Sequence, residues 1–374
     1  MNAATPSKSS PLGALLRFQE SGLLLVIFVL GLFLTLKGGT VERPKFTINA
    51  QGERERVFVT NKDGEQVPAT ELKNKFLNAE NLTQLAKDTS FIAIMAVGAT
   101  FIIISGGIDL SVGAIYALAS VMGALVFHRY GTDGAASGAL AGMLACVGTA
   151  ILCGVLNGGM IVALKVHPFI ITLGTMTIFR GIAFVITNGQ SVGDFPKAFR
   201  DIVRWETSGG LSLVPLGVMV LVGVAGWLYL SRMAAGRRIY AIGGNELASR
   251  YSGIRVERVK LSVFFFSGLT AGIAALLAIG YYGSASSGDG AGYELDVIAS
   301  AVVGGASLSG GRGTAFGALL GALIIKMIDN GIVILGIDQN YSRIIIGVAV
   351  ILAVVLDQFN AWLAKRRLAA RAGA

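Results

Sequence analysis

The stretch LAGMLACVGTAILCGVLNGGMIVAL, residues Leu140–Leu164, decides the fold class because it contains no charged side chain. About 20 apolar residues in a helix span the ~30 Å hydrocarbon core of a bilayer. The whole chain has the same character, since 53% of its 374 residues are hydrophobic and only 14% are charged. Soluble domains carry roughly 25% charged residues. The sequence therefore predicts a membrane protein and excludes a soluble globular domain.

Nine further apolar segments make ten in all: Gly22–Leu36, Ser90–Ile104, Leu110–Phe127, Pro168–Thr187, Leu213–Leu230, Leu261–Tyr282, Val297–Leu308, Ala315–Leu335 and Ile344–Leu363. Two of them, Ser90–Ile104 and Val297–Leu308, are short, so we expect them to be broken, tilted or buried where lipid does not reach the backbone. The 51 glycines suit helices that approach closely in lipid. The predicted fold class is an all-α polytopic membrane protein with about ten transmembrane helices, forming one domain over residues 1–374.

The net charge of +9 is concentrated at two places along the chain. Seven basic residues fall in the loop 231–260 and four more close the chain: Arg232, Arg237, Arg238, Arg250, Arg255, Arg258, Lys260, Lys365, Arg366, Arg367 and Arg371. Cytoplasmic loops carry such an excess of Lys and Arg. We therefore expect both termini and the loop 231–260 in the cytoplasm. No nucleic-acid partner is predicted, because the basic clusters lack interleaved aromatic residues.

The segment 37–87 is the one long polar stretch and is predicted to be an extracytoplasmic insert. Within it, RVFVTNKDGEQVP (Arg56–Pro68) has two extended runs around an Asn-Lys-Asp-Gly turn, which favours a small hairpin. The following LNAENLTQLAKD (Leu77–Asp88) has the pattern of a short amphipathic helix at the membrane interface.

Polar residues inside apolar segments are the first functional candidates, because burying them in lipid is costly. The sequence SGGIDLS (Ser105–Ser111) predicts a helix break in which Asp109 or Ser111 caps the next helix. Direct contact of Asp109 with a solute is the alternative. We take the following as candidates for a translocation path: Ser105, Gly106, Gly107, Asp109, Asn157, Thr172, Thr175 and Thr177.

The three threonines fall in FIITLGTMTIFRG (Phe169–Gly181). Their hydroxyls either form a stripe facing a polyhydroxylated solute or bond to the backbone of their own helix. Lys326 and Asp329 are three residues apart on one helix and can pair, with a proton relay as the alternative. Arg180 and Arg343 are close to segment ends and are expected to extend toward the membrane surface.

Two segments with the same Ser-Gly-Gly start raise the question of an internal repeat. SGGIDLSVGAIYALAS (Ser105–Ser120) and SGGRGTAFGALLGALI (Ser309–Ile324) align without a gap. Five identities in glycine- and alanine-rich sequence are compatible with chance as well as with a duplication.

The sequence contains no phosphate-binding loop, no zinc-protease motif, no nucleophile elbow and no Cys/His metal spacing. We expect no cofactor or metal in this chain, so work on a solute must draw on a partner chain or an ion gradient.

The basic loop, residues 231–260, offers an element on which another protein can dock. In GRRIYAIGGNELASRYSGI (Gly236–Ile254), Asn245 is a potential cap for a short helix that Gly253 ends. A solvated basic loop is the alternative.

Four motifs in order resemble the monosaccharide permeases of bacterial ABC importers, the ribose/xylose group. They are ISGGIDLSVGAIYALAS, HPFIITLGTMTIFRGIAFVITNGQ, GRRIYAIGGNELASRYSGI and LDVIASAVVGGASLSGGRGT, and the resemblance runs from about Asn78 to Asp357. It implies an inner-membrane permease that forms a dimer with itself or a paralogue. It also implies a cytoplasmic ATPase that binds ATP and Mg, and a periplasmic sugar-binding protein.

Carried over by position, the resemblance places the ATPase-coupling element in the loop 231–260, at Gly243, Gly244, Asn245, Glu246, Ala248 and Gly253. Leu247 stands where the wider importers have an alanine, and the glycine comes one residue late. The insert 37–87 is longer than the link in the family, and we expect it to help dock the binding protein. An importer for autoinducer-2, a nucleoside or inositol, an ion-coupled transporter and a membrane scaffold are the alternative functions.

Overall fold

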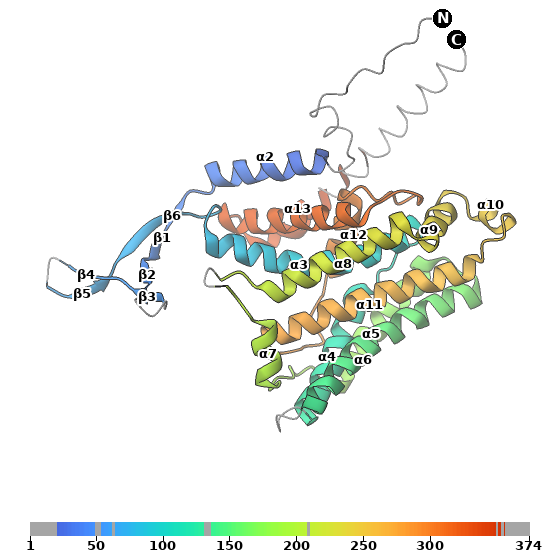
Figure 1. Cartoon of the computed structure of the whole chain (residues 1–374), viewed down its shortest axis with the longest axis horizontal. Coiled ribbons are helices and arrows are strands. Elements are labelled where there is room, and N and C mark those ends of the chain that lie inside the picture. The colour runs from blue at the N-terminus through green and yellow to red at the C-terminus, as the bar shows by residue number, and fades with distance from the viewer. Residues whose placement is uncertain are drawn as a thin grey trace, which may run out of the picture.

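The computed structural model describes residues 21–48, 54–61, 64–130, 136–207, 210–348, 351–352 and 355. These residues form a helical bundle with a small group of strands at one end (Figure 1). The helices are α2 (Ser21–Lys37), α3 (Ala79–Ile104), α4 (Val112–Tyr130), α5 (Ala136–Leu164), α6 (Pro168–Thr187), α7 (Lys197–Val203), α8 (Leu213–Arg232), α9 (Ala234–Gly244), α10 (Glu246–Tyr251), α11 (Val256–Tyr282), α12 (Tyr293–Val303) and α13 (Ala315–Ile334), with a 3-10 turn at Gln339–Tyr341.

Within the described residues, seven helices are long and apolar enough to cross a membrane: α3, α4, α5, α6, α8, α11 and α13. The apolar helix α2 is a little shorter. The segment expected at Val297–Leu308 is short as predicted, because α12 ends at Val303. Residues 342–348 are helical, while most of the last expected segment lies outside the described residues. The multi-pass helical fold is confirmed.

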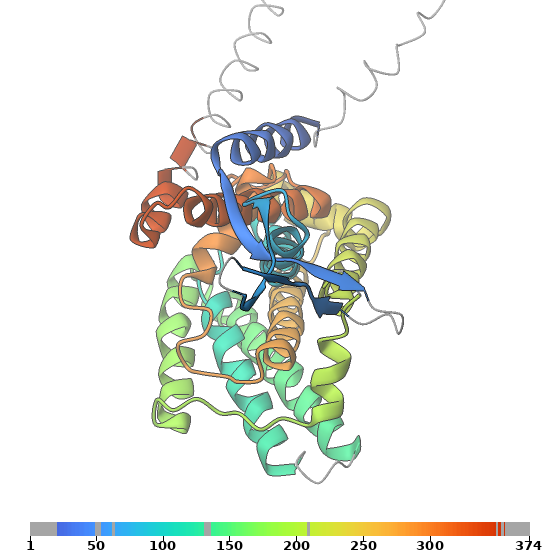
Figure 2. The same ribbon diagram turned by 90° about the vertical axis from the view of Figure 1, so that its left-hand side faces the viewer.

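The long helices run in roughly the same direction, so the bundle has two distinct ends (Figure 1). The strands and α7 lie at one end, and α9 and α10 lie at the other. Figure 2 looks from the strand end almost along the helices, with α2 and α13 on one side of the bundle. The insert and the basic loop therefore lie on opposite ends of the molecule.

Helix α3 lies in the centre of the bundle and packs against α8, α11, α12 and α13. Its residues from Phe91 to Ile104 are buried throughout. Because no side of this stretch faces lipid, its apolar residues show little helical periodicity. The prediction of a separate interfacial helix at Leu77–Asp88 is wrong. Asn78 caps a continuous helix by accepting from the Asn81 N–H at 2.8 Å, and the amphipathic stretch is its first turns.

The insert is more extended than the single hairpin that the sequence predicted. Its strands are β1 (Thr40–Pro44), β2 (Phe46–Ile48), β3 (Arg54–Arg56), β4 (Phe58–Thr60), β5 (Gln66–Pro68) and β6 (Thr70–Asn74). They form three antiparallel pairs, β1 with β6, β2 with β3 and β4 with β5. The β4–β5 pair is the hairpin expected around the Asn-Lys-Asp-Gly turn. The fold is therefore not all-α, although the described strands are confined to 40–74.

Helices α5 and α11 are in close backbone contact at glycine residues. A Cβ on Gly154 would collide with the carbonyl oxygen of Phe264, and one on Gly268 would collide with the carbonyl oxygen of Ala150. Elsewhere on α5, a Cβ on Gly148 would have no neighbour within 4 Å. Small residues let membrane helices approach so closely that van der Waals packing holds them together. The glycine excess thus serves packing at particular positions.

We predict that Gly154→Ala destabilises the bundle by about 1–3 kcal/mol, the usual cost of overpacking a core. The matched control is Gly148→Ala on the same helix, which gains helix propensity without a collision. Thermal unfolding of the purified protein in detergent, followed by circular dichroism, measures both. Equal melting temperatures for the two variants would contradict the close α5–α11 contact.

Candidate functional site

The break between α3 and α4 is held by a buried carboxylate. Gly106 adopts a left-handed φ of 83°, which lets the chain turn out of α3. Asp109 is 2% exposed, and its Oδ1 accepts from the N–H of Ser111 at 2.8 Å and from the Ser111 hydroxyl at 2.6 Å. Its Oδ2 accepts from the hydroxyl of Ser267 on α11 at 2.9 Å. Both carboxylate oxygens are thus used in shaping the start of α4.

Asn157 on α5 joins the same network. Its side-chain amide donates to the Ser111 hydroxyl at 2.7 Å, and Asn157 is fully buried. Four polar residues from three regions of the chain therefore meet inside the bundle. Sequence reasoning found Asp109 and Asn157 but missed Ser267. A lone serine in an apolar helix carries no local signal, and only the packing of α11 against α4 and α5 reveals its partner.

The threonines of α6 divide into two groups. Thr172 is fully buried and donates to the carbonyl oxygens of Pro168 and Ile108, at 3.0 and 3.3 Å. Thr175 is buried and donates to the carbonyl oxygen of Ile171. Thr177 is exposed on another side of α6 and donates to the carbonyl oxygen of Gly174. Each of the three hydroxyls therefore donates to a backbone carbonyl oxygen in this conformation. Thr172 also connects α6 to the break between α3 and α4.

A junction of three loops lies at the end of the bundle that carries α9 and α10. The carbonyl oxygen of Ile104, at the end of α3, accepts from the N–H of Gly311 at 2.8 Å. Gly243, near the end of α9, packs so tightly on this pair that a Cβ would collide with the Ile104 carbonyl oxygen. A Cβ on Gly310 would lie 2.7 Å from the Gly243 oxygen and 3.2 Å from the Gly106 Cα. Backbone thus touches backbone across all three loops.

The two Ser-Gly-Gly segments that align in sequence meet at this junction. Gly106 and Gly310 both have a φ of 83°, and each segment lies between a helix that ends and a helix that begins. Their side-by-side position leaves both explanations of the alignment open, a duplication and chance. The two turns are not identical, because Gly311 also has a positive φ, 74°, whereas Gly107 does not.

The basic loop contains the short helix that the sequence predicted, preceded by a further helix, α9, that it did not. Asn245 caps α10 by accepting from the Ala248 N–H at 2.9 Å, and Gly253 follows the helix with a φ of 81°. Glu246 pairs with Lys260 at 2.8 Å, which anchors α10 to the start of α11. Leu247 is 61% exposed and Tyr251 is 82% exposed, so α10 presents an uncovered apolar pair.

At the opposite end, Lys326 forms an ion cluster. Its Nζ lies 2.9 Å from both Asp329 and Asp296, and the Ser342 hydroxyl donates to Asp329 at 2.6 Å. The pairing of Lys326 with Asp329 is confirmed, whereas Asp296 was missed because it comes from α12. The cluster borders a cavity of about 340 Å³ that Asp88, Tyr282 and Tyr293 also line. A charge-paired, partly aromatic cavity of this kind can form hydrogen bonds to a neutral polar solute.

Arg180 does not extend toward the membrane surface as expected. Its guanidinium donates to the backbone oxygens of Ser287 and Asp289, at 2.9 and 3.2 Å, and so holds the loop between α11 and α12. Arg343 lies against the same loop, 3.4 Å from the Ala291 oxygen. In the part of the chain that the structure describes, no group of three or more His, Cys, Asp or Glu residues could hold a metal ion.

The bundle of long apolar helices, broken at a buried polar network, defines a polytopic membrane protein. Residues 81–354 match the family model described as branched-chain amino acid transport system / permease component, and the chain belongs to this family. Its relatives are transport permeases, and permeases of ABC importers generally work with ATPase and substrate-binding partners.

The curated relatives include sugar importers. The chain is 40% identical over 288 residues to the ribose import permease protein RbsC of Escherichia coli strain K12, covering 76% of this chain and 88% of the relative. It is 40% identical over 300 residues to RbsC of Bacillus subtilis strain 168, covering 77% and 87%. It is 39% identical over 284 residues to the D-allose transport system permease protein AlsC of E. coli strain K12, covering 76% and 85%. No solved structure matches.

We predict that Ser267→Ala lowers the free energy of unfolding by about 1–3 kcal/mol, because it leaves a buried carboxylate oxygen without its partner. Ser231→Ala on α8 is the control, since that exposed hydroxyl donates to the carbonyl oxygen of Trp227 on its own helix. Its change should stay within about 0.5 kcal/mol. Denaturant unfolding in detergent measures both, and an unchanged Ser267→Ala midpoint would show that the network does not hold the break.

Proposed function

We propose that this chain is the permease subunit of an ATP-driven importer for a monosaccharide, a pentose or hexose. The family and the relatives' printed substrates, ribose and D-allose, support the solute class. The observation that carries the mechanism is the exposed apolar pair on α10, a helix that directly follows the junction residue Gly243 in the chain. The chain would work in a bacterial inner membrane with ten spans and both termini in the cytoplasm. Its partners would be a second permease subunit, an ATPase pair that binds ATP and Mg, and a periplasmic binding protein.

Helix α10 has the features of a docking element. Leu247 and Tyr251 are four residues apart, so they lie on one side of the helix and are open to a partner. Tyrosine is enriched among the few residues that contribute most of the binding energy in protein interfaces. The pairs Glu246–Lys260 and Arg250–Glu257, at 2.8 and 2.6 Å, hold the helix in place. We assign α10, with Gly243 to Gly253, as the contact with the ATPase.

The junction can transmit a movement of the docked ATPase to the helices in the membrane. Movement of α9 displaces Gly243, which lies against the end of α3 and the loop before α13. Because these contacts are backbone against backbone, there is no flexible side chain to absorb the movement. We propose that the break Ser105–Ser111 belongs to the translocation path as the part that moves. Asp109, Asn157, Thr172 and Thr175 then shape the break, while Gly106, which is exposed, can face the solute.

The function is tested by reconstituting the chain in liposomes with its ATPase and binding protein. We expect uptake of radiolabelled ribose or another monosaccharide that requires ATP and persists in the presence of a protonophore. Uptake that needs no ATPase and stops with the protonophore would instead indicate an ion-coupled transporter. Competition by autoinducer-2, nucleosides or inositol, with no effect of monosaccharides, would reassign the solute.

We predict that replacing Leu247 and Tyr251 by Ala together lowers the affinity for the ATPase at least about tenfold, because two exposed apolar anchors are lost. ATP-driven uptake should fall with it, while the permease stays folded. Tyr130→Ala is the matched control, since Tyr130 is 55% exposed at the opposite end of the bundle. Biolayer interferometry with the purified ATPase measures the affinity. Unchanged binding by the double variant would reject α10 as the dock.

We further propose that the insert 37–87 faces the periplasm and contacts the binding protein. It lies at the end opposite α10, and its strand surface exposes Phe58 (52%), Val59 (49%) and Leu72 (70%). The insert is attached to the helical bundle at a different place from this exposed surface. The β1–β6 pair joins it to the bundle, where Phe76 is buried beside Leu34 of α2. The outer strands can therefore be removed without disturbing the bundle.

We predict that replacing residues 46–68 with Asn-Gly lowers the affinity for the binding protein about tenfold or more. The Lys45 N–H donates to the Ala69 oxygen at 2.7 Å, so these residues face each other and a two-residue turn can join them. ATPase binding should not change, which serves as the control. Full affinity for the binding protein and normal uptake would show that the insert has another role.

A further inference from the structure

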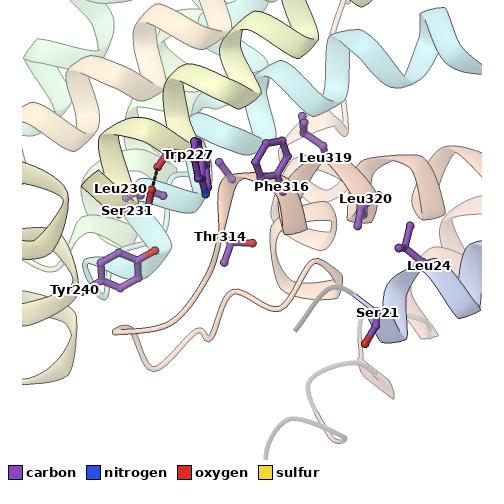
Figure 3. Close-up of a pocket in the computed structure, with 11 residues that line it drawn as sticks. Ser21, Leu24, Trp227, Leu230, Ser231, Tyr240, Thr314, Phe316, Leu319 and Leu320 are labelled. Atoms are coloured by element: carbon purple, nitrogen blue, oxygen red, sulfur yellow. Dashed lines mark hydrogen bonds between the residues drawn. The ribbon is translucent and has the colours of Figure 1, made fainter. Parts of the chain in front are cut away.

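An apolar groove opens between α2, α8 and α13 near the end that carries α9 (Figure 3). Its volume is about 650 Å³, and its walls include Leu24 of α2, Trp227 of α8 and Phe316, Leu319 and Leu320 of α13. Trp227 and Phe316 lie with their ring centroids 6.0 Å apart. Tyr240 of α9 closes the end nearest the junction, with its hydroxyl donating to the Gly313 oxygen at 2.7 Å. The shape and lining suit a hydrocarbon chain.

Positive charge lies at the mouth of this groove. The guanidinium of Arg232 lies 5.6 Å from the ring centroid of Trp227, which is itself a wall of the groove. Arg237 approaches the same place, with Nη1 3.4 Å from the Arg232 carbonyl oxygen. Arg238, the next residue, interacts electrostatically with Tyr229 instead. All three are exposed, and none forms an ion pair within the described ranges. Elsewhere in the basic loop, Arg250 and Lys260 are neutralised by Glu257 and Glu246.

We infer that this groove binds an anionic phospholipid, with an acyl chain between α2, α8 and α13 and the phosphate against Arg232. Trp and Tyr are enriched at the level of lipid head groups, which places Trp227 and Tyr240 where the phosphate and acyl regions meet. Basic residues immediately beside a transmembrane helix attract anionic lipid head groups. A zwitterionic lipid fills the same groove but gains much less from Arg232 and Arg237. The inference is independent of the transported solute and of the ATPase.

Such a lipid would lie between α2, α8 and α13, which contact one another over only part of their length. Helix α2 packs mainly on α13, around Leu34 and Met327 near the strand end. At the groove end, Leu24 is 51% exposed and faces the opening. A bound lipid would fill this space and stabilise the ends of α8 and α13 beside the junction at Gly313.

The test uses the full chain in detergent and counts bound phosphatidylglycerol and phosphatidylcholine of equal chain length by native mass spectrometry. We expect phosphatidylglycerol to bind preferentially. Arg232→Gln should weaken it about fivefold, and replacing Arg232 and Arg237 together should abolish the preference. Arg129→Gln is the control. The Arg129 guanidinium also lies 5.6 Å from an aromatic ring centroid, that of Tyr130, but at the opposite end of the bundle. Equal binding of both lipids, or an equal effect of Arg129→Gln, would overturn the inference.

A second pair of variants tests the groove without changing charge. Leu24→Trp places a large side chain in the opening and should reduce phosphatidylglycerol binding several-fold. Leu25→Trp is the matched control, since Leu25 is 62% exposed on the same helix and does not line the groove. Full lipid binding by Leu24→Trp would show that the groove holds another occupant, such as residues 1–20 of this chain. That result would also overturn the inference.

Discussion

The contact on which the proposed mechanism depends is between Gly243 and the carbonyl oxygen of Ile104. It joins α9 to the end of the central helix α3 at a point where only a residue without a Cβ fits. The Gly311 N–H donates to the same carbonyl oxygen, so the loop before α13 is part of the same contact. Backbone groups in contact cannot change rotamer, and a displacement at α9 therefore has to move α3, α13 or both.

The break after α3 is held in place by a buried polar network. An open turn inside a membrane bundle exposes backbone groups that lipid cannot satisfy. Here Asp109 accepts three hydrogen bonds, from the Ser111 N–H and from the hydroxyls of Ser111 and Ser267. Asn157 and Thr172 attach the break to α5 and α6. These hydrogen bonds attach the turn to the surrounding helices, which allows an irregular backbone to persist there.

Much of the architecture was predictable from local sequence because lipid imposes a simple rule on length and polarity. The spans of α5, α6, α8 and α13 follow directly from apolar runs, and the cap of α10 follows from Asn245. The prediction was wrong at Leu77–Asp88, where an amphipathic stretch continues into the buried helix α3. It also missed α9, because a helix with five basic or glycine residues among its 11 resembles a loop.

The sequence by itself determined that this chain is a multi-pass membrane protein of the permease family, because uncharged runs must form helices in lipid and four motifs occur in a fixed order. It also located the break at Asp109 and the short helix α10 after Asn245. Only the tertiary structure decided which residues meet: Ser267 with Asp109, Asp296 with Lys326, and Gly243 with Ile104. These partners are 158, 30 and 139 positions apart, so no local pattern encodes their contact, and the packing of whole helices brings them together.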